Sequence, residues 1–262
     1  MSAAAGRLEA LLQLMRRLRD PQRGCPWDRA QDFATIAPHT IEEAYELEDA
    51  IAGGEAARIR DELGDLLFQV VFHAQLAAER GWFEFADVAA GIHDKLVRRH
   101  PHVFGDAAPG AEADLARAWD EAKARERAAA GAGGALAGVA LALPALARAS
   151  KLARRAGAVG FDWFDERAVR PKIAEELRET EEAIGAGDAA AVEEELGDVL
   201  FAVANWARLL KVDPESALRA ANRKFERRFA AMEALAQSRG WALADLDAAR
   251  WEELWTSVKA AE

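Results

Sequence analysis

The sequence predicts an all-α protein in which one helical unit occurs twice. Ala, Leu, Glu and Arg recur along the whole chain, and no alternation of apolar and polar residues is long enough to indicate a strand. Residues 36–77 align without a gap with residues 169–210, and 19 of the 42 positions are identical. The length of 262 residues is therefore explained by a tandem duplication.

The apolar spacing of the first half predicts helices at 6–19, 38–52, 55–80, 84–99 and 112–130. The first of these carries charges throughout, so it lacks the apolar stretch of a secretory signal. Pro38 suits the first turn of the second helix, where a missing amide hydrogen breaks no helical bond. Gly53 and Gly54 then allow the chain to turn into the third helix.

The second half repeats this pattern, with helices predicted at 142–156, 169–185, 188–210, 214–238 and 246–260. Pro171 again suits a first turn, and Pro214 follows a stop near Lys211. The stretch 128–144 is rich in Gly and Ala, which is typical of a linker. We therefore predict an N-terminal domain at 1–127 and a C-terminal domain at 145–262.

Charge, the length of apolar runs and cysteine content exclude several classes of protein. The chain has 34 Lys and Arg against 45 Asp and Glu, a net charge of −11, which argues against binding nucleic-acid polymers or anionic membranes. No apolar run reaches the roughly 18 residues that span a bilayer. The single cysteine, Cys25, rules out a disulfide framework and is expected to be structural. We expect a soluble, cytoplasmic protein that makes no contact with membranes.

Each copy carries two pairs of acidic residues on successive predicted helices. The first pair has the pattern Glu-x-x-Glu and the second Glu-x-x-Asp, so the members of a pair share one helix face. The residues are Glu43, Glu46, Glu62 and Asp65 in the first copy, and Glu176, Glu179, Glu195 and Asp198 in the second. The spacing between the pairs allows an antiparallel return, so we expect the pairs to face each other across a helical hairpin.

The neighbouring residues favour a metal site over a solvated acidic face. The helices at 55–80 and 188–210 are apolar nearly all round, which predicts that they are buried. Four clustered, partly buried carboxylates need a cation, and an all-oxygen ligand set suits Mg²⁺ or Mn²⁺. A di-iron centre would need Glu-x-x-His on two helices, and no histidine occupies such a position. His100 and His102 have a spacing that can bind a metal, but we expect them to be incidental.

Basic and aromatic residues recur at matched places in the two copies. The pairs, each four residues apart, are Lys95 and Arg99 with Lys224 and Arg228, and Trp119 and Lys123 with Trp255 and Lys259. A lysine or arginine can bind a phosphate, and an indole can stack on a nucleobase. These residues alone leave open the alternative of a basic surface beside core tryptophans.

These features together resemble the MazG family of nucleoside triphosphate pyrophosphohydrolases. The resemblance covers nearly the whole chain, and its specificity lies in the ordered acidic pairs, present twice. The matching stretches are LRDPQRGCPWD (18–28), TIEEAYEL (40–47), DELGDLLFQVVFHAQ (61–75), DKLVRRHPHVF (94–104), VGFDW (159–163), EEELGDVLFAVANWARLL (193–210) and ANRKFERRF (221–229).

The resemblance implies two tandem MazG-type helical domains whose four-helix-bundle cores are completed by dimerisation around the metal site. It implies hydrolysis of NTPs and dNTPs to the monophosphate and pyrophosphate with Mg²⁺, or Mn²⁺ as a substitute, in sanitation or regulation of the nucleotide pool. The second copy is expected to carry this activity. A homodimer is the expected assembly, and a helical regulatory protein that binds nucleotide without turnover is the alternative.

By the same resemblance, the acids of the second copy hold Mg²⁺, and a further set of residues contacts the nucleotide, with the indole at the base. This set is Lys172, Glu193, Glu194, Lys224, Arg228, Trp255 and Lys259. Glu175 and Glu179 are the candidates for the base that takes the proton of the attacking water. The chain departs from the family pattern at Ala191, where a basic residue is expected, and His39 replaces Lys172 in the first copy.

Overall fold

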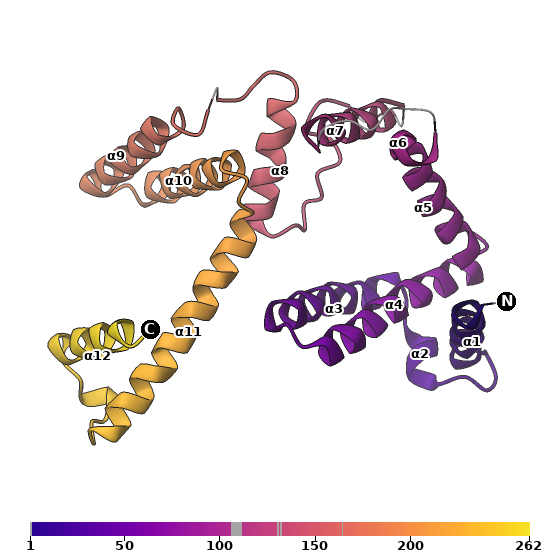
Figure 1. Ribbon diagram of the computed structural model, residues 1–262, viewed down its shortest axis with the longest axis horizontal. Coiled ribbons are helices and arrows are strands. Elements are labelled where there is room, and N and C mark those ends of the chain that lie inside the picture. The colour runs from indigo at the N-terminus through magenta and orange to yellow at the C-terminus, as the bar shows by residue number, and fades with distance from the viewer. Residues whose placement is uncertain (1, 106–111, 130, 132, 164) are drawn as a thin grey trace. The chain divides into compact units, whose positions relative to one another are not determined.

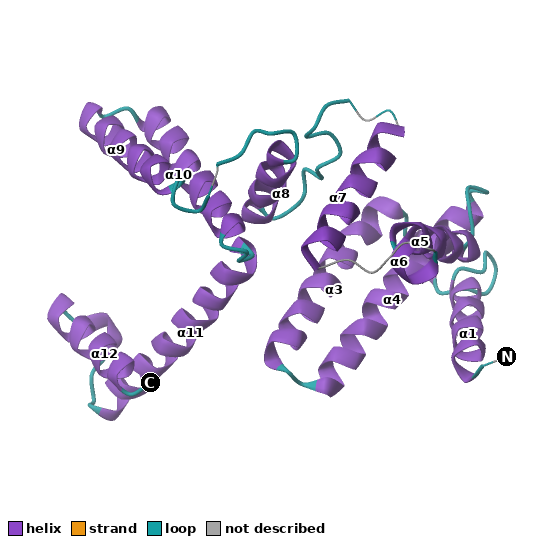
Figure 2. Ribbon diagram, turned by 45° about the horizontal axis from the view of Figure 1, so that its top comes forward, coloured by secondary structure: helices purple, strands orange, loops and turns teal. Residues whose placement is uncertain are grey.

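The computed structural model describes residues 2–105, 112–129, 131, 133–163 and 165–262 (Figures 1 and 2). Within these residues the regular structure is helical and includes no strand, which confirms the predicted all-α class. The chain divides into two compact units, Met1–Ala124 and Arg125–Glu262. The predicted domain limits at 127 and 145 stay a prediction.

The first unit is built on an antiparallel hairpin of two long helices, α3 and α4 (Figure 1). Helix α1 packs on α4, and Met15 from α1 meets Ile36, Phe72 and Leu76 in a buried core. The helices are α1 (Ala3–Leu18), α2 (Pro26–Ala30), α3 (Phe33–Gly53), α4 (Ala56–Glu79), α5 (Phe85–Arg99), α6 (Pro101–Phe104) and α7 (Glu112–Ala129), the last of which runs past the unit boundary. The short α2 and α6 were not predicted, because four or five residues give no apolar period.

Pro38 does not mark the first turn of its helix, and that prediction is wrong. Helix α3 begins five residues earlier, at Phe33, with Pro38 inside it. The reason is a strong cap: Asp32 Oδ1 accepts the backbone N–H of Thr35 at 2.9 Å, and Thr35 Oγ1 accepts the N–H of Asp32 at 2.8 Å. The early start also buries Ile36, which is 2% exposed, in the core.

The second unit repeats the hairpin with α9 and α10, and α8 packs on α10. Helix α12 packs on α11, and Met232, Ala236 and Leu254 form the core there. The bounds are α8 (Ala145–Gly157), α9 (Arg170–Ala186), α10 (Ala189–Leu209), α11 (Pro214–Ser238), η1 (Leu243–Asp245) and α12 (Ala248–Ala260). Gly187, with φ of 70°, ends α9 as Gly54, with φ of 73°, ends α3, so both hairpins turn at a left-handed glycine.

The second helix of each hairpin is not buried on all sides, which corrects the sequence prediction. In one chain α3 or α9 covers only one face, and a stripe of large apolar side chains stays exposed. We call these residues the apolar stripes: Leu63, Leu67 and Val70 on α4, and Leu196, Leu200 and Val203 on α10. Among the described residues, no helix is both long and apolar enough to span a membrane.

Candidate metal centre and nucleotide site

The α3–α4 hairpin brings three of its predicted metal ligands together. One carboxylate oxygen each of Glu43, Glu62 and Asp65 lie within 4.8 Å of one another. We call this set the N-terminal triad. The pair of helices accounts for it, because Glu43 projects from α3 toward Glu62 and Asp65, which share one face of α4. The fourth predicted ligand, Glu46, is exposed and lies outside the triad.

The α9–α10 hairpin repeats the arrangement with a different third member. Oxygens of Glu176, Glu179 and Glu195 lie within 4.8 Å of one another and form the C-terminal triad. Glu176 is 5% exposed, so one carboxylate of this triad is nearly out of water. Asp198, the fourth predicted ligand, is exposed and lies outside the triad.

The negative charges of each set act on one another. Burial raises the pKa of the Glu43 carboxyl, and neighbouring carboxylates raise it further, in the order Asp65, Glu46, Glu62 and Glu42. Burial also raises the pKa of Glu195, followed by the charges of Glu179, Glu176, Asp198 and Glu194. All four predicted ligands of each copy therefore belong to one electrostatic group, which a cation would stabilise.

A basic residue already lies beside the C-terminal triad. The ammonium Nζ of Lys172 lies 2.7 Å from Glu176 Oε1 and 3.2 Å from Glu175 Oε1. The hydrogen bond to Glu176 raises the pKa of Lys172, and the bond to Glu175 raises it further. In the first copy His39 takes this place, with its Nδ1 3.2 Å from Glu42 Oε2. Lys172 thus places a positive charge in direct contact with one carboxylate of the C-terminal triad.

Four of the predicted nucleotide contacts lie on α11 and α12, namely Lys224, Arg228, Trp255 and Lys259. The Arg228 guanidinium carbon lies 5.3 Å from the centroid of the Trp255 ring, and Lys259 Nζ lies 5.7 Å from it. Two nitrogens of Arg228 hold Glu262, with Nη2 2.6 Å from Oε2. The hydrogen bond to Arg228 lowers the pKa of Glu262, and the charges of Arg227 and Lys224 lower it further.

An open cavity of about 490 Å³ adjoins this cluster, between α11 and α12. Arg227, Arg228 and Arg239 line it together with Glu262. A concave surface with several guanidinium groups suits an oxyanion ligand. Sequence reasoning missed Glu262, because this residue lies beyond the end of α12 at Ala260, where helical spacing gives no signal.

The predicted residues of the second copy thus form two groups. One is the acidic group with Lys172, Glu175 and the exposed Glu193 and Glu194, which precede Glu195 on α10. The other is the basic and aromatic group of α11 and α12. Among the described residues, no hydrogen bond, ion pair or ring contact joins the two groups within one chain.

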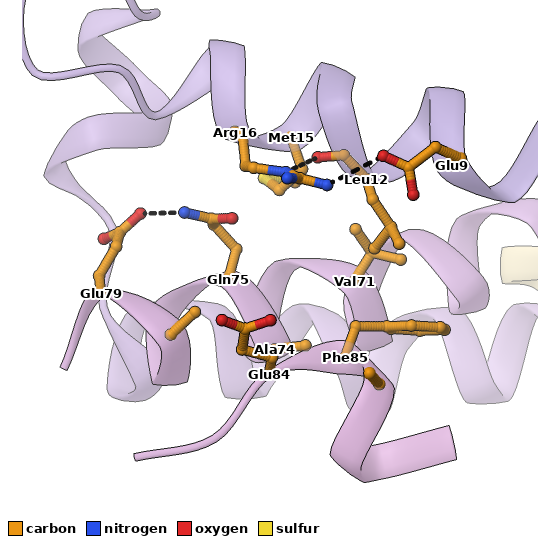
Figure 3. A pocket seen from close by; sticks show the side chains of 12 residues that line it. Glu9, Leu12, Met15, Arg16, Val71, Ala74, Gln75, Glu79, Glu84 and Phe85 are labelled. Carbon is orange, nitrogen blue, oxygen red and sulfur yellow. Dashed lines mark hydrogen bonds and ion pairs between the residues drawn. The ribbon is translucent and has the colours of Figure 1, made fainter. Parts of the chain in front are cut away.

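Another cavity, of about 440 Å³, lies between α1, α4 and the start of α5 and contains none of the predicted site residues. Two pairs of polar side chains in this cavity are bonded to each other, as Figure 3 shows. Arg16 Nη2 lies 3.3 Å from Glu9 Oε1, and Gln75 Nε2 donates to Glu79 Oε1 at 2.9 Å. It therefore offers less for ligand chemistry than the triads do.

Comparison with known proteins decides the family. The protein-family model described as the MazG nucleotide pyrophosphohydrolase domain matches residues 31–104 and 164–231. These segments contain both sets of predicted metal ligands. The chain belongs to the MazG family. The matched segments include the hairpins α3–α4 and α9–α10, so each MazG segment contains one copy of the repeat.

Close MazG-like relatives extend over nearly the whole chain. A protein of Escherichia coli strain K12 named nucleoside triphosphate pyrophosphohydrolase is 48% identical over 97% of this chain and 98% of its own length. A Thermotoga maritima protein named nucleoside triphosphate pyrophosphohydrolase/pyrophosphatase MazG is 44% identical over 99% of this chain and 98% of its own length. Both alignments therefore extend beyond the two MazG segments, toward α7 and α12.

Proposed function

We propose that this MazG family member is a Mg²⁺-dependent nucleoside triphosphate pyrophosphohydrolase that converts NTPs and dNTPs to the monophosphate and pyrophosphate. The observation that carries the proposal is the C-terminal triad with Lys172 bonded to one of its carboxylates. Such a site can hold a divalent cation and a phosphate side by side. The Escherichia coli and Thermotoga maritima relatives are both named as nucleoside triphosphate pyrophosphohydrolases, which supports the reaction class.

The residues present fit Mg²⁺, with Mn²⁺ as a substitute. The donor set is all oxygen, and charge repulsion within it is relieved by a divalent cation. When bound, Mg²⁺ polarises phosphoryl oxygens and lowers the pKa of a water. We propose that Glu176, Glu179, Glu195 and Asp198 hold it in the second copy. Glu43, Glu46, Glu62 and Asp65 are the equivalent residues in the first copy.

The residues around the acids have distinct proposed roles. Glu179, or Glu175 beside it, accepts the proton of the attacking water. The water oxygen forms a bond to the α-phosphorus, the bond from that phosphorus to the bridging oxygen breaks, and pyrophosphate leaves. Lys172 holds a phosphate oxygen and steadies the charge that passes to the leaving group.

The α11–α12 group is proposed to bind the rest of the nucleotide. Trp255 stacks on the base, while Lys224, Arg228 and Lys259 bind phosphates as charged donors. A phosphate that bonds both nitrogens of Arg228 would take the place of the Glu262 carboxylate. Glu193 and Glu194 are proposed to lie beside the substrate on α10. Ala191 offers no charged group, so the basic residues of this hairpin that contact the acids are Lys172 and Arg178, whose Nη2 lies 3.3 Å from Glu179 Oε1.

We propose that the working form is a homodimer. The apolar stripes occur at matched positions on α4 and α10, and each is exposed in the single chain, with Leu63 at 52% and Leu200 at 57%. Contiguous apolar surface of this kind marks a protein interface. A second copy of the chain that covered the stripes would complete a four-helix bundle at each hairpin.

The test is a product-resolved assay with purified protein, Mg²⁺ and each NTP and dNTP. We expect equal amounts of monophosphate and pyrophosphate. Glu195→Gln and Asp198→Asn are expected to lower kcat by at least about a hundredfold, since each replaces a charged carboxylate of the proposed metal site with a neutral amide. Glu233→Gln, an exposed glutamate of α11, is the matched control and should keep full activity.

Three results would contradict the proposal. Full activity in both acidic variants would contradict the proposal that the acids of the second copy hold the catalytic metal. Release of single phosphates without pyrophosphate would exclude the reaction type. A thermal shift with NTP and Mg²⁺ but no product would instead identify a binding protein without turnover.

A further inference from the structure

The junction of α5 and α7 in the first unit repeats the basic and aromatic group of α11 and α12. The Arg99 guanidinium carbon lies 5.0 Å from the centroid of the Trp119 ring, and Lys123 Nζ lies 5.1 Å from it. The corresponding distances in the second unit are 5.3 and 5.7 Å. Both indoles are half-buried, and the same two kinds of cation approach each ring.

The match extends beyond the ring contacts. Lys95 stands one helical turn before Arg99, as Lys224 stands before Arg228, and both lysines are exposed. Along the sequence Glu126 follows Lys123 by three residues, as Glu262 follows Lys259. In the second unit Arg228 binds the carboxylate of Glu262 with two nitrogens, so this arrangement accepts an oxyanion.

One substitution distinguishes the first unit. At the position of Phe229, next to the ring-contacting arginine, this unit has His100, whose ring centroid lies 5.0 Å from that of Trp119. His100 Nδ1 lies 2.7 Å from the carbonyl oxygen of Leu96, to which it donates. Nε2 is then the ring atom that can accept from a ligand hydroxyl, or donate to a phosphate when protonated.

We infer that the first unit carries a second binding site for a nucleoside polyphosphate, at the junction of α5 and α7. Its residues are Arg99, His100, Trp119 and Lys123. An indole beside two cations recognises a flat ring joined to an anion, which is the chemistry of a nucleotide. The site rests on the proposed function, because it takes the same class of ligand as the α11–α12 group.

The experiment counts bound ligand on the full chain. Equilibrium dialysis uses the α,β-methylene analogues of ATP and dCTP with Mg²⁺, because the bond between the α and β positions of these analogues cannot be hydrolysed. Wild type is expected to bind two equivalents of at least one analogue per chain. Lys259→Gln should weaken one equivalent, and Lys123→Gln or Arg99→Gln should weaken the other by about tenfold or more. Arg7→Gln removes a charge from exposed surface of the same unit and is the control.

A single equivalent in wild type that is unaffected by Lys123→Gln and Arg99→Gln would overturn the second site. If these variants fail to fold by circular dichroism, His100→Phe decides, because it introduces the residue of the second copy. It should weaken only the N-terminal equivalent, by about tenfold, and unchanged affinity would count against the site. Two equivalents with no pyrophosphate from NTP would contradict the proposed function and leave the second site standing. Pyrophosphate release from NTP by a chain that binds only one equivalent of analogue would support the proposed function and contradict the second site.

Discussion

The acidic residues of each hairpin repel one another, and a bound cation would reduce this repulsion. Glu195 is the clearest case, since burial and then the charges of Glu179 and Glu176 raise its pKa. In the absence of metal, the folded protein holds a proton on this carboxyl at a pH where the unfolded chain has lost it. Stability from this group is therefore fully present below its ordinary pKa of 4.5 and is lost as pH rises through the raised value.

Replacing this charge should stabilise the metal-free protein. We expect Glu195→Gln to melt at a higher temperature than wild type at pH 7.5 in EDTA. The neutral amide of the variant is not repelled by the carboxylates of Glu179 and Glu176. Addition of Mg²⁺ should raise the melting temperature of wild type more than that of the variant. Differential scanning calorimetry measures both, with Glu233→Gln as control. Equal melting temperatures in EDTA and equal responses to Mg²⁺ would contradict the metal site.

The proposed Mg²⁺ site shares the carboxylate of Glu176 with Lys172, so the ion and the ammonium would compete for it. Lys172→Met removes an ammonium 2.7 Å from Glu176, so we expect Mg²⁺ to bind about tenfold tighter in the absence of nucleotide. The same change should raise the KM for NTP by about tenfold, since a phosphate contact is lost. Calorimetric titration and steady-state kinetics measure these effects, with Lys151→Met, on the exposed surface of α8, as control. Weaker Mg²⁺ binding in Lys172→Met would argue against a metal at Glu176.

At the scale of the element, local capping decides where a helix begins. Asp32 accepts the N–H groups of Ala34 and Thr35, and the bond to Thr35 is the main cause of its lowered pKa. We expect Asp32→Ala to lower the urea midpoint at pH 7, and this difference to shrink as pH falls through the lowered pKa of Asp32. Glu55→Ala is the control, because Glu55 is the N-cap of α4 but makes no side-chain cap bond. An unchanged midpoint in Asp32→Ala would show that the cap adds no stability.

The repeat and the hairpins could be predicted from the sequence, because apolar periodicity and acidic spacing are local signals. The start of α3 could not, because Pro38 is a strong local signal that the Asp32 cap and the burial of Ile36 outweigh. The triads were predicted as sets of four, but side-chain geometry places Glu46 and Asp198 outside them. The pairing of Arg228 with Glu262 depends on how α11 and α12 pack, which spacing alone does not determine.

At the scale of the whole molecule, the exposed apolar stripes predict that two copies of the chain associate. We expect wild type to have the mass of a dimer by light scattering. The double variant Leu67→Asp/Leu200→Asp should be monomeric and should lose activity by at least about tenfold, because it places charges in both stripes. Leu141→Asp changes a residue that is 84% exposed outside the hairpins and should have no effect. A monomeric wild type with full activity would contradict the dimer.

The most direct test of the account is hydrolysis in water enriched in oxygen-18, with the products separated and weighed by mass spectrometry. Attack at the α-phosphorus within the carboxylate site predicts one oxygen-18 atom in the nucleoside monophosphate and none in the pyrophosphate. Both products should require Mg²⁺ and nearly disappear in Glu195→Gln. Label in the pyrophosphate, or formation of nucleoside diphosphate and orthophosphate, would contradict the account.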